Sequence, residues 1–213
     1  MKTDDLIAGL AARTPVIPAS LAWRRLSVAV LAAALAALVI LKLGWGMRPD
    51  IHEAMRTSAF WMKALYTLAL GAAGLLLVER VGRPGARTGA GLFVLAAALL
   101  TIAGLAAREL MALPIADWRA DWTGESSWHC PMRITILAAP AFAAALLVLR
   151  RMAPPRPVLA GAAAGLLAGG VGATVYGLGC TETAAAFTAG WYTLGVAVWA
   201  AVGALVGPRV LRW

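Results

Sequence analysis

The sequence predicts an all-α membrane protein: a bundle of six transmembrane helices with both termini in the cytoplasm. Of its 213 residues, 62% are hydrophobic and 14% are charged, whereas a soluble domain is usually about 45–50% apolar and about 25% charged. The apolar residues form six long blocks, each close to the roughly 20 residues that a helix needs to cross a bilayer. Basic residues lie mainly in alternate connections between the blocks, which indicates the orientation.

The six apolar blocks predict six spans and a two-part chain. In chain order the spans cover residues 26–44, 60–78, 89–107, 131–149, 158–178 and 186–206. The first block follows a polar tail and is too long for the apolar core of a cleavable signal peptide, so we expect it to remain as a helix. We therefore divide the chain into a cytoplasmic tail, residues 1–25, and a six-helix transmembrane sensor domain, residues 26–213.

The basic residues predict which side of the membrane each connection faces. Twelve lie on the side of the tail and five on the opposite side, so the tail side is cytoplasmic by the positive-inside rule. Lys42 and Lys63 sit near the outer boundary and can extend to water there. Most acidic residues also lie outside. The net charge of +9 is therefore a topology signal, and we expect no direct contact with nucleic acid.

Small residues recur at four-residue spacing in the last two blocks. Gly161, Gly165 and Gly169 share one face of the fifth block, and Gly203 and Gly207 repeat the pattern in the sixth. Small residues let helix backbones approach closely in lipid, where apolar contact alone gives little advantage. We therefore interpret these faces as helix-packing surfaces.

The tryptophans predict an ordered cap on the outer side. An indole ring favours the membrane interface, because its N–H seeks water while the ring stays in an apolar layer. Six of the nine tryptophans lie near the outer boundary, more than anchoring requires. They are Trp45, Trp61, Trp118, Trp122, Trp128 and Trp191.

The tail has the residue types of a short amphipathic docking helix: a capping hydroxyl, two acids at the positive helix start and three apolar residues on one face. These residues are Thr3, Asp4, Asp5, Leu6, Ile7 and Leu10. A three-turn helix is marginal alone in water, so we expect its apolar face to dock in a partner's groove. The alternative is a helix on the membrane surface, which its acidic start disfavours because anionic lipids repel it.

Both cysteines and both histidines lie on the predicted outer face. Cys130 precedes the fourth span and Cys180 follows the fifth, and a short inner loop should pair these helices so that the sulfurs can meet. Three interpretations remain open: a structural disulfide, a redox switch, or a soft-metal site that prefers copper or another thiophilic ion. In the metal interpretation Cys130, Cys180 and His129 are the first ligands, joined by His52 or a methionine.

The sequence offers no basis for catalysis. The inner loops are too short for an active site, and the motifs of nucleotide-binding loops, zinc proteases and serine hydrolases are missing from the sequence. A thiol oxidoreductase would need a second redox pair, and a small transporter would need ionisable residues deep in the bundle. These two classes and a pure assembly factor remain the alternatives to a non-enzymatic signal transducer.

Three segments carry a family resemblance: the opening MKTDDLIAGLA, the outer WTGESSWHCP, and the later GLGCTETAAAFTAGWYTLG. With their order and spacing, the chain resembles the NrsF-type polytopic anti-sigma factors over its whole length. Those are six-helix inner-membrane proteins that negatively regulate an extracytoplasmic-function sigma factor. The resemblance implies that residues 3–10 hold the sigma factor, and that Cys130 and Cys180 are needed to respond to heavy-metal or oxidative stress.

The expected function is therefore a membrane anti-sigma factor in the bacterial inner membrane. At rest the tail sequesters the sigma factor. A thiophilic metal, copper in first place, or an oxidant then engages Cys130 and Cys180, shifts the fourth and fifth helices and releases it. The expected partners are the sigma factor and the lipid bilayer. We expect no constitutive cofactor, only a regulatory metal ion.

Overall fold

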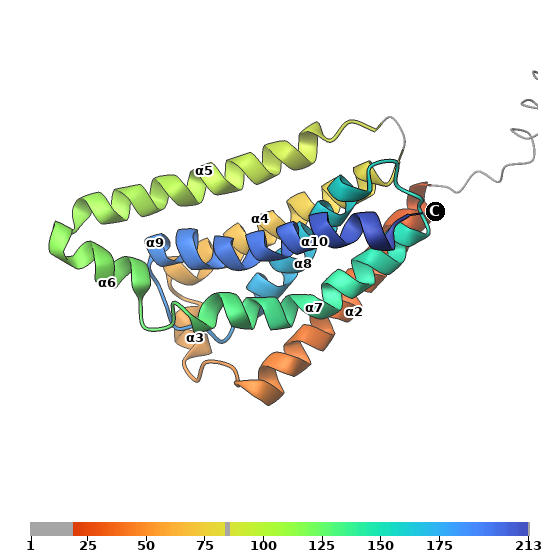
Figure 1. The fold of residues 1–213 in the computed structure, drawn as a ribbon. Helices are drawn as coiled ribbons and strands as arrows, with labels where there is room; N and C mark the ends of the chain where they lie inside the picture. Colours follow the sequence, from red (N-terminus) through yellow and green to blue (C-terminus); the bar gives the residue numbers. More distant parts are fainter. Residues whose placement is uncertain (1–18, 84–85, 213) are drawn as a thin grey trace, which may run out of the picture.

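The computed structural model describes residues 19–83 and 86–212, and within these ranges the only regular structure is helical (Figure 1). The elements in chain order are α2 (Ala19–Gly44), α3 (Ile51–Ala54), α4 (Ser58–Val81), α5 (Gly89–Ala112), η1 (Ile115–Asp117), α6 (Trp118–Thr123), α7 (His129–Arg150), α8 (Pro157–Tyr176), α9 (Ala185–Phe187), η2 (Thr188–Tyr192) and α10 (Thr193–Val210). The all-α prediction is confirmed.

Six helical segments of the described chain are long and apolar enough to cross a membrane: α2, α4, α5, α7, α8, and the continuous run of α9, η2 and α10. The prediction of six helices long and apolar enough to cross a membrane is therefore confirmed. Most observed helices extend beyond the predicted blocks. α2 begins at Ala19, inside the predicted tail, and α5 continues to Ala112 rather than residue 107. Hydropathy marks the apolar part of a helix, whereas hydrogen bonding continues into its polar end turns.

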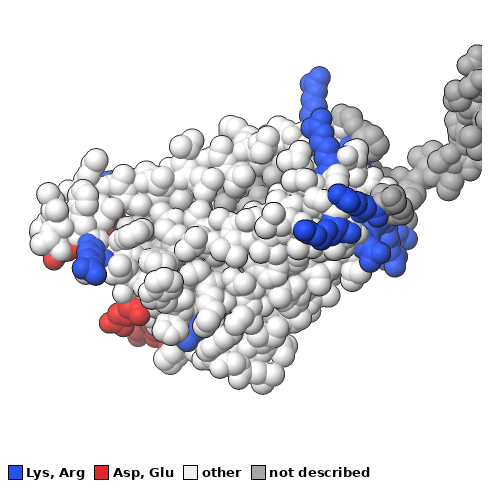
Figure 2. Space-filling model, in the orientation of Figure 1, with Lys and Arg blue, Asp and Glu red and all other residues white. Residues whose placement is uncertain are grey.

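The two ends of the bundle differ in charge. We call one the arginine end: there α2, α5 and α8 begin, and α4, α7 and α10 finish. We call the other the cysteine end, which carries α3, η1, α6 and the connection between α8 and α9. Most Lys and Arg side chains visible in Figure 2 gather at the arginine end, and the visible Asp and Glu side chains lie at the cysteine end.

α8 is the central helix and the most buried of the six spans. It packs against α4, α7 and α10, because its small side chains leave room for close approach. A Cβ atom on Gly161 would overlap the carbonyl oxygen of Gly203 in α10, and one on Gly165 would overlap that of Trp199. The predicted packing role of these glycines is thus confirmed.

The peripheral helices expose large apolar faces. Val28, Leu31 and Leu35 of α2 and Phe93 and Leu100 of α5 are all more than half exposed. Contiguous apolar surface of this kind is rare on soluble proteins and marks a membrane or protein contact. The exposed faces therefore agree with helices that lie against lipid.

The predicted cap is present at the cysteine end. The rings of Trp122 and Trp128 both lie beside that of Trp191, with centroids 5.9 Å and 6.2 Å away. The indole nitrogen of Trp191 also donates a hydrogen bond of 2.8 Å to the carbonyl oxygen of Trp122. These contacts join α6 and the start of α7 to η2, so the connections at the cysteine end are ordered structure.

Candidate functional site

The two cysteines lie at the same end of the bundle. Cys130 is in the first turn of α7, and Cys180 follows the end of α8. The packing of α7 against α8 brings them there, as the short loop between the helices predicts. Both are free thiols and both are buried, and they lie within electrostatic range of each other.

Arg48 fastens the Cys180 segment to the exit of α2. Its backbone N–H donates to the carbonyl of Leu178 at 3.3 Å, and its Nη1 donates to the carbonyl of Cys180 at 3.2 Å. Arg48 also pairs with Asp50, with 2.6 Å between Nη2 and Oδ2. The hydrogen bond to Asp50 raises the pKa of Arg48 above its ordinary value, and the same bond lowers the pKa of Asp50. Both groups are therefore held in their charged forms.

We expected Lys63 to extend to water at the outer boundary, but its side chain points into the bundle. Only 4% of the residue is exposed. Its Nζ donates to the carbonyl oxygen of Glu182, lies 5.5 Å from the centroid of the Tyr192 ring and interacts with the side chain of Cys180. A carbonyl, an aromatic face and a nearby sulfur replace water as partners for the ammonium group, so the side chain has no need to leave the helix bundle.

The Glu182 carboxylate joins the segments around the two cysteines. Its Oε1 accepts hydrogen bonds from the backbone N–H of Glu125 at 2.9 Å, the N–H of Ser126 at 3.1 Å and the Ser126 hydroxyl at 2.8 Å. The carbonyl of Ser126 in turn accepts from the backbone N–H of Cys130 at 2.9 Å. A charged acceptor makes stronger hydrogen bonds than a neutral one, so Glu182 is a firm tether between the two segments.

Tyr192 closes the cluster from the last span. It ends η2, a π-helical turn between α9 and α10, and such turns are frequent at functional sites. Its ring lies 5.7 Å from that of Tyr176, centroid to centroid. The buried Tyr192 hydroxyl makes no hydrogen bond to any described residue, and it interacts electrostatically with the side chains of Cys180, Cys130 and Tyr176. We call Lys63, Cys130, Cys180, Glu182 and Tyr192 the thiol cluster.

The two histidines stand apart from this arrangement. His52 on α3 and His129 at the start of α7 are both exposed, whereas the thiols are buried. Across residues 19–83 and 86–212 the structure brings together no group of three or more His, Cys, Asp or Glu side chains that could hold a metal ion. The four residues expected as metal ligands are therefore not assembled into one site.

The predicted docking residues Thr3, Asp4, Asp5, Leu6, Ile7 and Leu10 lie outside the described residues. The prediction that this tail binds a partner stays a prediction. α2, which follows it, begins at Ala19 at the arginine end.

The chemistry available to the thiol cluster is that of sulfur. Reactive cysteines need an electropositive surrounding, whereas a thiol buried among apolar groups is inert. Lys63 supplies a positive charge within the bundle, and Arg133, one turn after Cys130, interacts electrostatically with that thiol. Because both thiols are buried, oxidation of the sulfurs or capture of a soft cation would require a local opening of this end of the bundle.

Sequence reasoning identified the cysteines and missed the residues that surround them. The signal for Lys63 was a charged residue inside an otherwise apolar span, where ionisable groups usually have a function. Glu182 carried a weaker signal, two positions after Cys180. Tyr192 and Arg48 gave none, because their roles depend on helix packing and on a loop contact between distant parts of the chain.

Comparison with known proteins places the chain in a family. A family model described as "Negative regulator of sigma F" matches residues 10–213. The anti-sigma-F factor NrsF of Caulobacter vibrioides is 40% identical over 215 residues, and the probable anti-sigma-F factor NrsF of Azospira oryzae is 38% identical over 213 residues. Both alignments cover 100% of each chain. No solved structure matches. The chain belongs to the NrsF family of negative regulators of sigma F.

Proposed function

We propose that this protein is an inner-membrane anti-sigma factor that holds an extracytoplasmic-function sigma factor through residues 1–25. It releases that factor when Cys130 and Cys180 meet a thiophilic metal, copper in first place, or an oxidant outside the cytoplasm. Membership of the family supports the sigma factor as partner. The positive-inside rule supports a cytoplasmic arginine end and an outward cysteine end. The protein carries out no reaction of its own.

One observation carries this proposal: both thiols lie in one buried cluster at the end opposite the start of α2. A metal ion or a new covalent bond that joins the two sulfurs would move the segments that carry them, because both thiols are buried beside the Lys63 side chain. The tail precedes α2 at the other end of the bundle. A signal must then pass along the helices from one end to the other.

The contacts of α2 supply a route for that signal. Arg48, which follows α2, is bonded to the Cys180 segment, and α2 packs against α7, which begins beside Cys130. A rearrangement of either thiol therefore acts on α2, which leads directly to the tail. The coupling free energy in such systems is typically about 1–3 kcal/mol, or roughly 5–150-fold in affinity.

The inducing chemistry follows from the donors nearby. A soft ion such as copper would be held by the two sulfurs, with His129 beside Cys130 in sequence as the nearest imidazole and His52 on α3 as a further candidate. Because both histidines are exposed, metal binding requires a local opening that brings them to the sulfurs. Disulfide formation requires that the two thiols meet and that the oxidant takes up the two electrons and two protons that they release.

The tail is tested by capture of the sigma factor from cell membranes with the full-length protein. The double variant Leu6→Asp and Leu10→Asp should lose most of the captured factor, because charge on the apolar face opposes docking. Ala8→Asp with Ala12→Asp adds the same charge to the opposite helical face and should retain it. Equal capture by both double variants would reject the docking face.

The sensor is tested by induction of sigma-dependent transcription. Cys130→Ser and Cys180→Ser should each abolish the response to copper and to oxidant while basal repression remains. His129→Ala and His52→Ala should weaken the copper response alone if an imidazole completes a metal site. Intact-mass measurement separates the mechanisms further, because a disulfide removes two hydrogens whereas a bound metal adds its own mass. Unchanged induction in both cysteine variants would remove the sensor role.

A further inference from the structure

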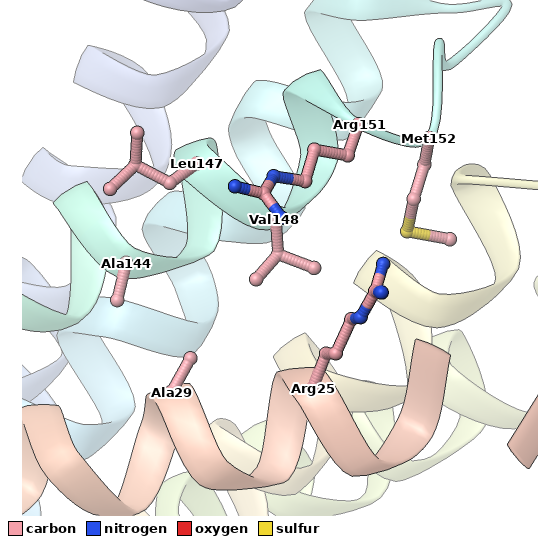
Figure 3. A pocket seen from close by; sticks show the side chains of 7 residues that line it. All are labelled: Arg25, Ala29, Ala144, Leu147, Val148, Arg151 and Met152. Carbon is pink, nitrogen blue, oxygen red and sulfur yellow. The ribbon is translucent and has the colours of Figure 1, made fainter. Parts of the chain in front are cut away.

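A groove between α2 and α7 opens at the arginine end (Figure 3). The cavity has a volume of about 400 Å³, within the range of small-molecule sites. Its floor is apolar, formed by Ala29 of α2 and by Ala144, Leu147 and Val148 of α7. The small alanine side chains keep the two helices from filling the space between them.

Two guanidinium groups overhang this apolar floor. The Arg25 side chain rises from α2 toward Met152, and the Arg151 side chain folds back from the end of α7 over Val148 (Figure 3). Neither Arg25 nor Arg151 has an ion-pair or hydrogen-bond partner among the described residues. Two positive charges that face one groove repel each other, and an anion bound between them would offset this repulsion. The guanidinium fork is well matched to a phosphate group.

We propose that this groove binds an anionic phospholipid, with its phosphate between Arg25 and Arg151 and an acyl chain along the apolar floor. The inference requires only that the helices cross a membrane, so it is independent of the sigma factor and of the thiols. Basic pockets between transmembrane helices at a membrane face are suited to anionic headgroups. A free phosphate would use the arginines but leave the apolar floor without a role.

The position of the groove favours lipid over a protein segment. Leu147 is 63% exposed, and Ala32, one turn after Ala29 on the same face of α2, is also exposed, so the groove continues the lipid-facing surface. An acyl chain has no polar groups to satisfy there. A peptide laid along the same floor would have to satisfy its backbone N–H and C=O groups away from water. A lipid in this position bridges the helix that begins beside Cys130 and the helix that follows the tail.

Native mass spectrometry of the full-length protein tests the proposal, with phosphatidylglycerol and phosphatidylcholine supplied in equal amounts in mild detergent. The wild-type protein should retain one phosphatidylglycerol in preference to phosphatidylcholine. Arg25→Gln with Arg151→Gln should reduce this preference at least about tenfold, because hydrogen bonds to charged groups are worth an order of magnitude or more in binding. Ala144→Phe, which fills the groove without changing charge, should also lose the lipid.

A matched control separates the groove from diffuse attraction. Arg24 and Arg150 are the sequence neighbours of the two groove arginines, are exposed, and do not line the cavity. Arg24→Gln with Arg150→Gln makes the same change in net charge and should leave lipid retention unchanged. Thermal unfolding of each variant without added lipid identifies any variant that has lost its fold, and the remaining variants decide the question.

Three results would overturn the proposal. Equal loss of lipid in both arginine pairs would indicate general charge attraction instead of a site. Displacement of the lipid by glycerol phosphate at a similar concentration would indicate an anion site that ignores the acyl chain. Retention of phosphatidylglycerol only after Asp4→Asn with Asp5→Asn would indicate that the protein's own acidic tail is the occupant.

Discussion

The two ends of the bundle are held together in different ways. At the cysteine end polar groups join segments far apart in sequence: Arg48 reaches Cys180, Lys63 reaches Glu182, and Glu182 reaches Ser126. At the arginine end Glu79 forms local ion pairs with its neighbours Arg80 and Arg83. Distant segments meet there through glycine backbones instead.

This difference agrees with the roles proposed for the two ends. Backbone contacts between small residues depend on shape alone and respond little to the chemistry of the surroundings. A network of charged and hydrogen-bonded groups responds to protons, ions and oxidation, because each member depends on its partners. The cysteine end is therefore suited to detect a chemical change, and the arginine end to keep the helices in register while it occurs.

The largest effect is expected where the glycine packing is closest. Gly161→Leu places a side chain against the backbone of Gly203, and overpacking costs about 1–3 kcal/mol even where side chains can adjust. Because backbone cannot move aside, we expect a strong fall in thermal stability in detergent and in the yield of folded protein. Gly104→Leu is the control, since nothing lies within 4 Å of a Cβ there. A small effect at Gly161 would mean that the arginine end is not held by this contact.

The second effect concerns the tether at the other end. Glu182→Ala removes the acceptor shared by the Glu125 N–H and by Ser126, and each such hydrogen bond contributes about 0.5–1.5 kcal/mol net. Hydrogen exchange measured by mass spectrometry should become faster in residues 124–130 while α8 and α10 stay protected. Glu125→Ala, an exposed neighbour, should leave exchange unchanged. Faster exchange through the whole bundle would contradict the idea of two separately held ends.

A weaker, pH-dependent effect is expected at Arg48. Arg48→Gln removes the charged group bonded to the Cys180 carbonyl and to Asp50, so hydrogen exchange in residues 177–184 should become faster at pH 7. The bond to Arg48 lowers the pKa of Asp50. The stabilisation from this pair is therefore fully present above the ordinary pKa of Asp, and it is lost as the pH falls through the lowered pKa of Asp50. The difference between variant and wild type should therefore narrow below about pH 4. A difference that is constant with pH would exclude the ion pair as its source.

The sequence could predict the spans because each depends on local hydropathy. Gly161 and Gly203 were also predictable as packing positions, since their four-residue spacing marks one helix face. The thiol cluster was only half predictable. Cys130 and Cys180 follow from topology, but Lys63 could equally have extended outward, and only the three-dimensional structure gives it the Glu182 carbonyl and the Tyr192 ring as partners.

The connections at the cysteine end were beyond prediction for a related reason. Tyr192 enters the cluster because the last span contains a π-helical turn, which shifts the register of every later residue by a fraction of a turn. No residue in the sequence marks that turn. Arg48 stands 132 positions from Cys180, and a contact of that separation follows from the assembled bundle rather than from any local pattern.

The smallest effect tests whether the cysteine end carries strain. The pKa of Asp121 in α6 is raised by burial and then by the charge of Glu109, and its buried Oδ2 has no hydrogen-bond partner among the described residues. Above this raised pKa the charged carboxylate destabilises the fold. The folded protein binds the proton more tightly than the unfolded chain does, so this destabilisation disappears as the pH falls through the raised pKa. Asp121→Asn should raise the unfolding temperature slightly at pH 7, with a gain that shrinks in acid. Asp117→Asn, exposed at the start of the same helix, should give no rise. If Asp121→Asn instead lowers stability at pH 7, the carboxylate has a favourable partner, and the cysteine end stores no strain at this position.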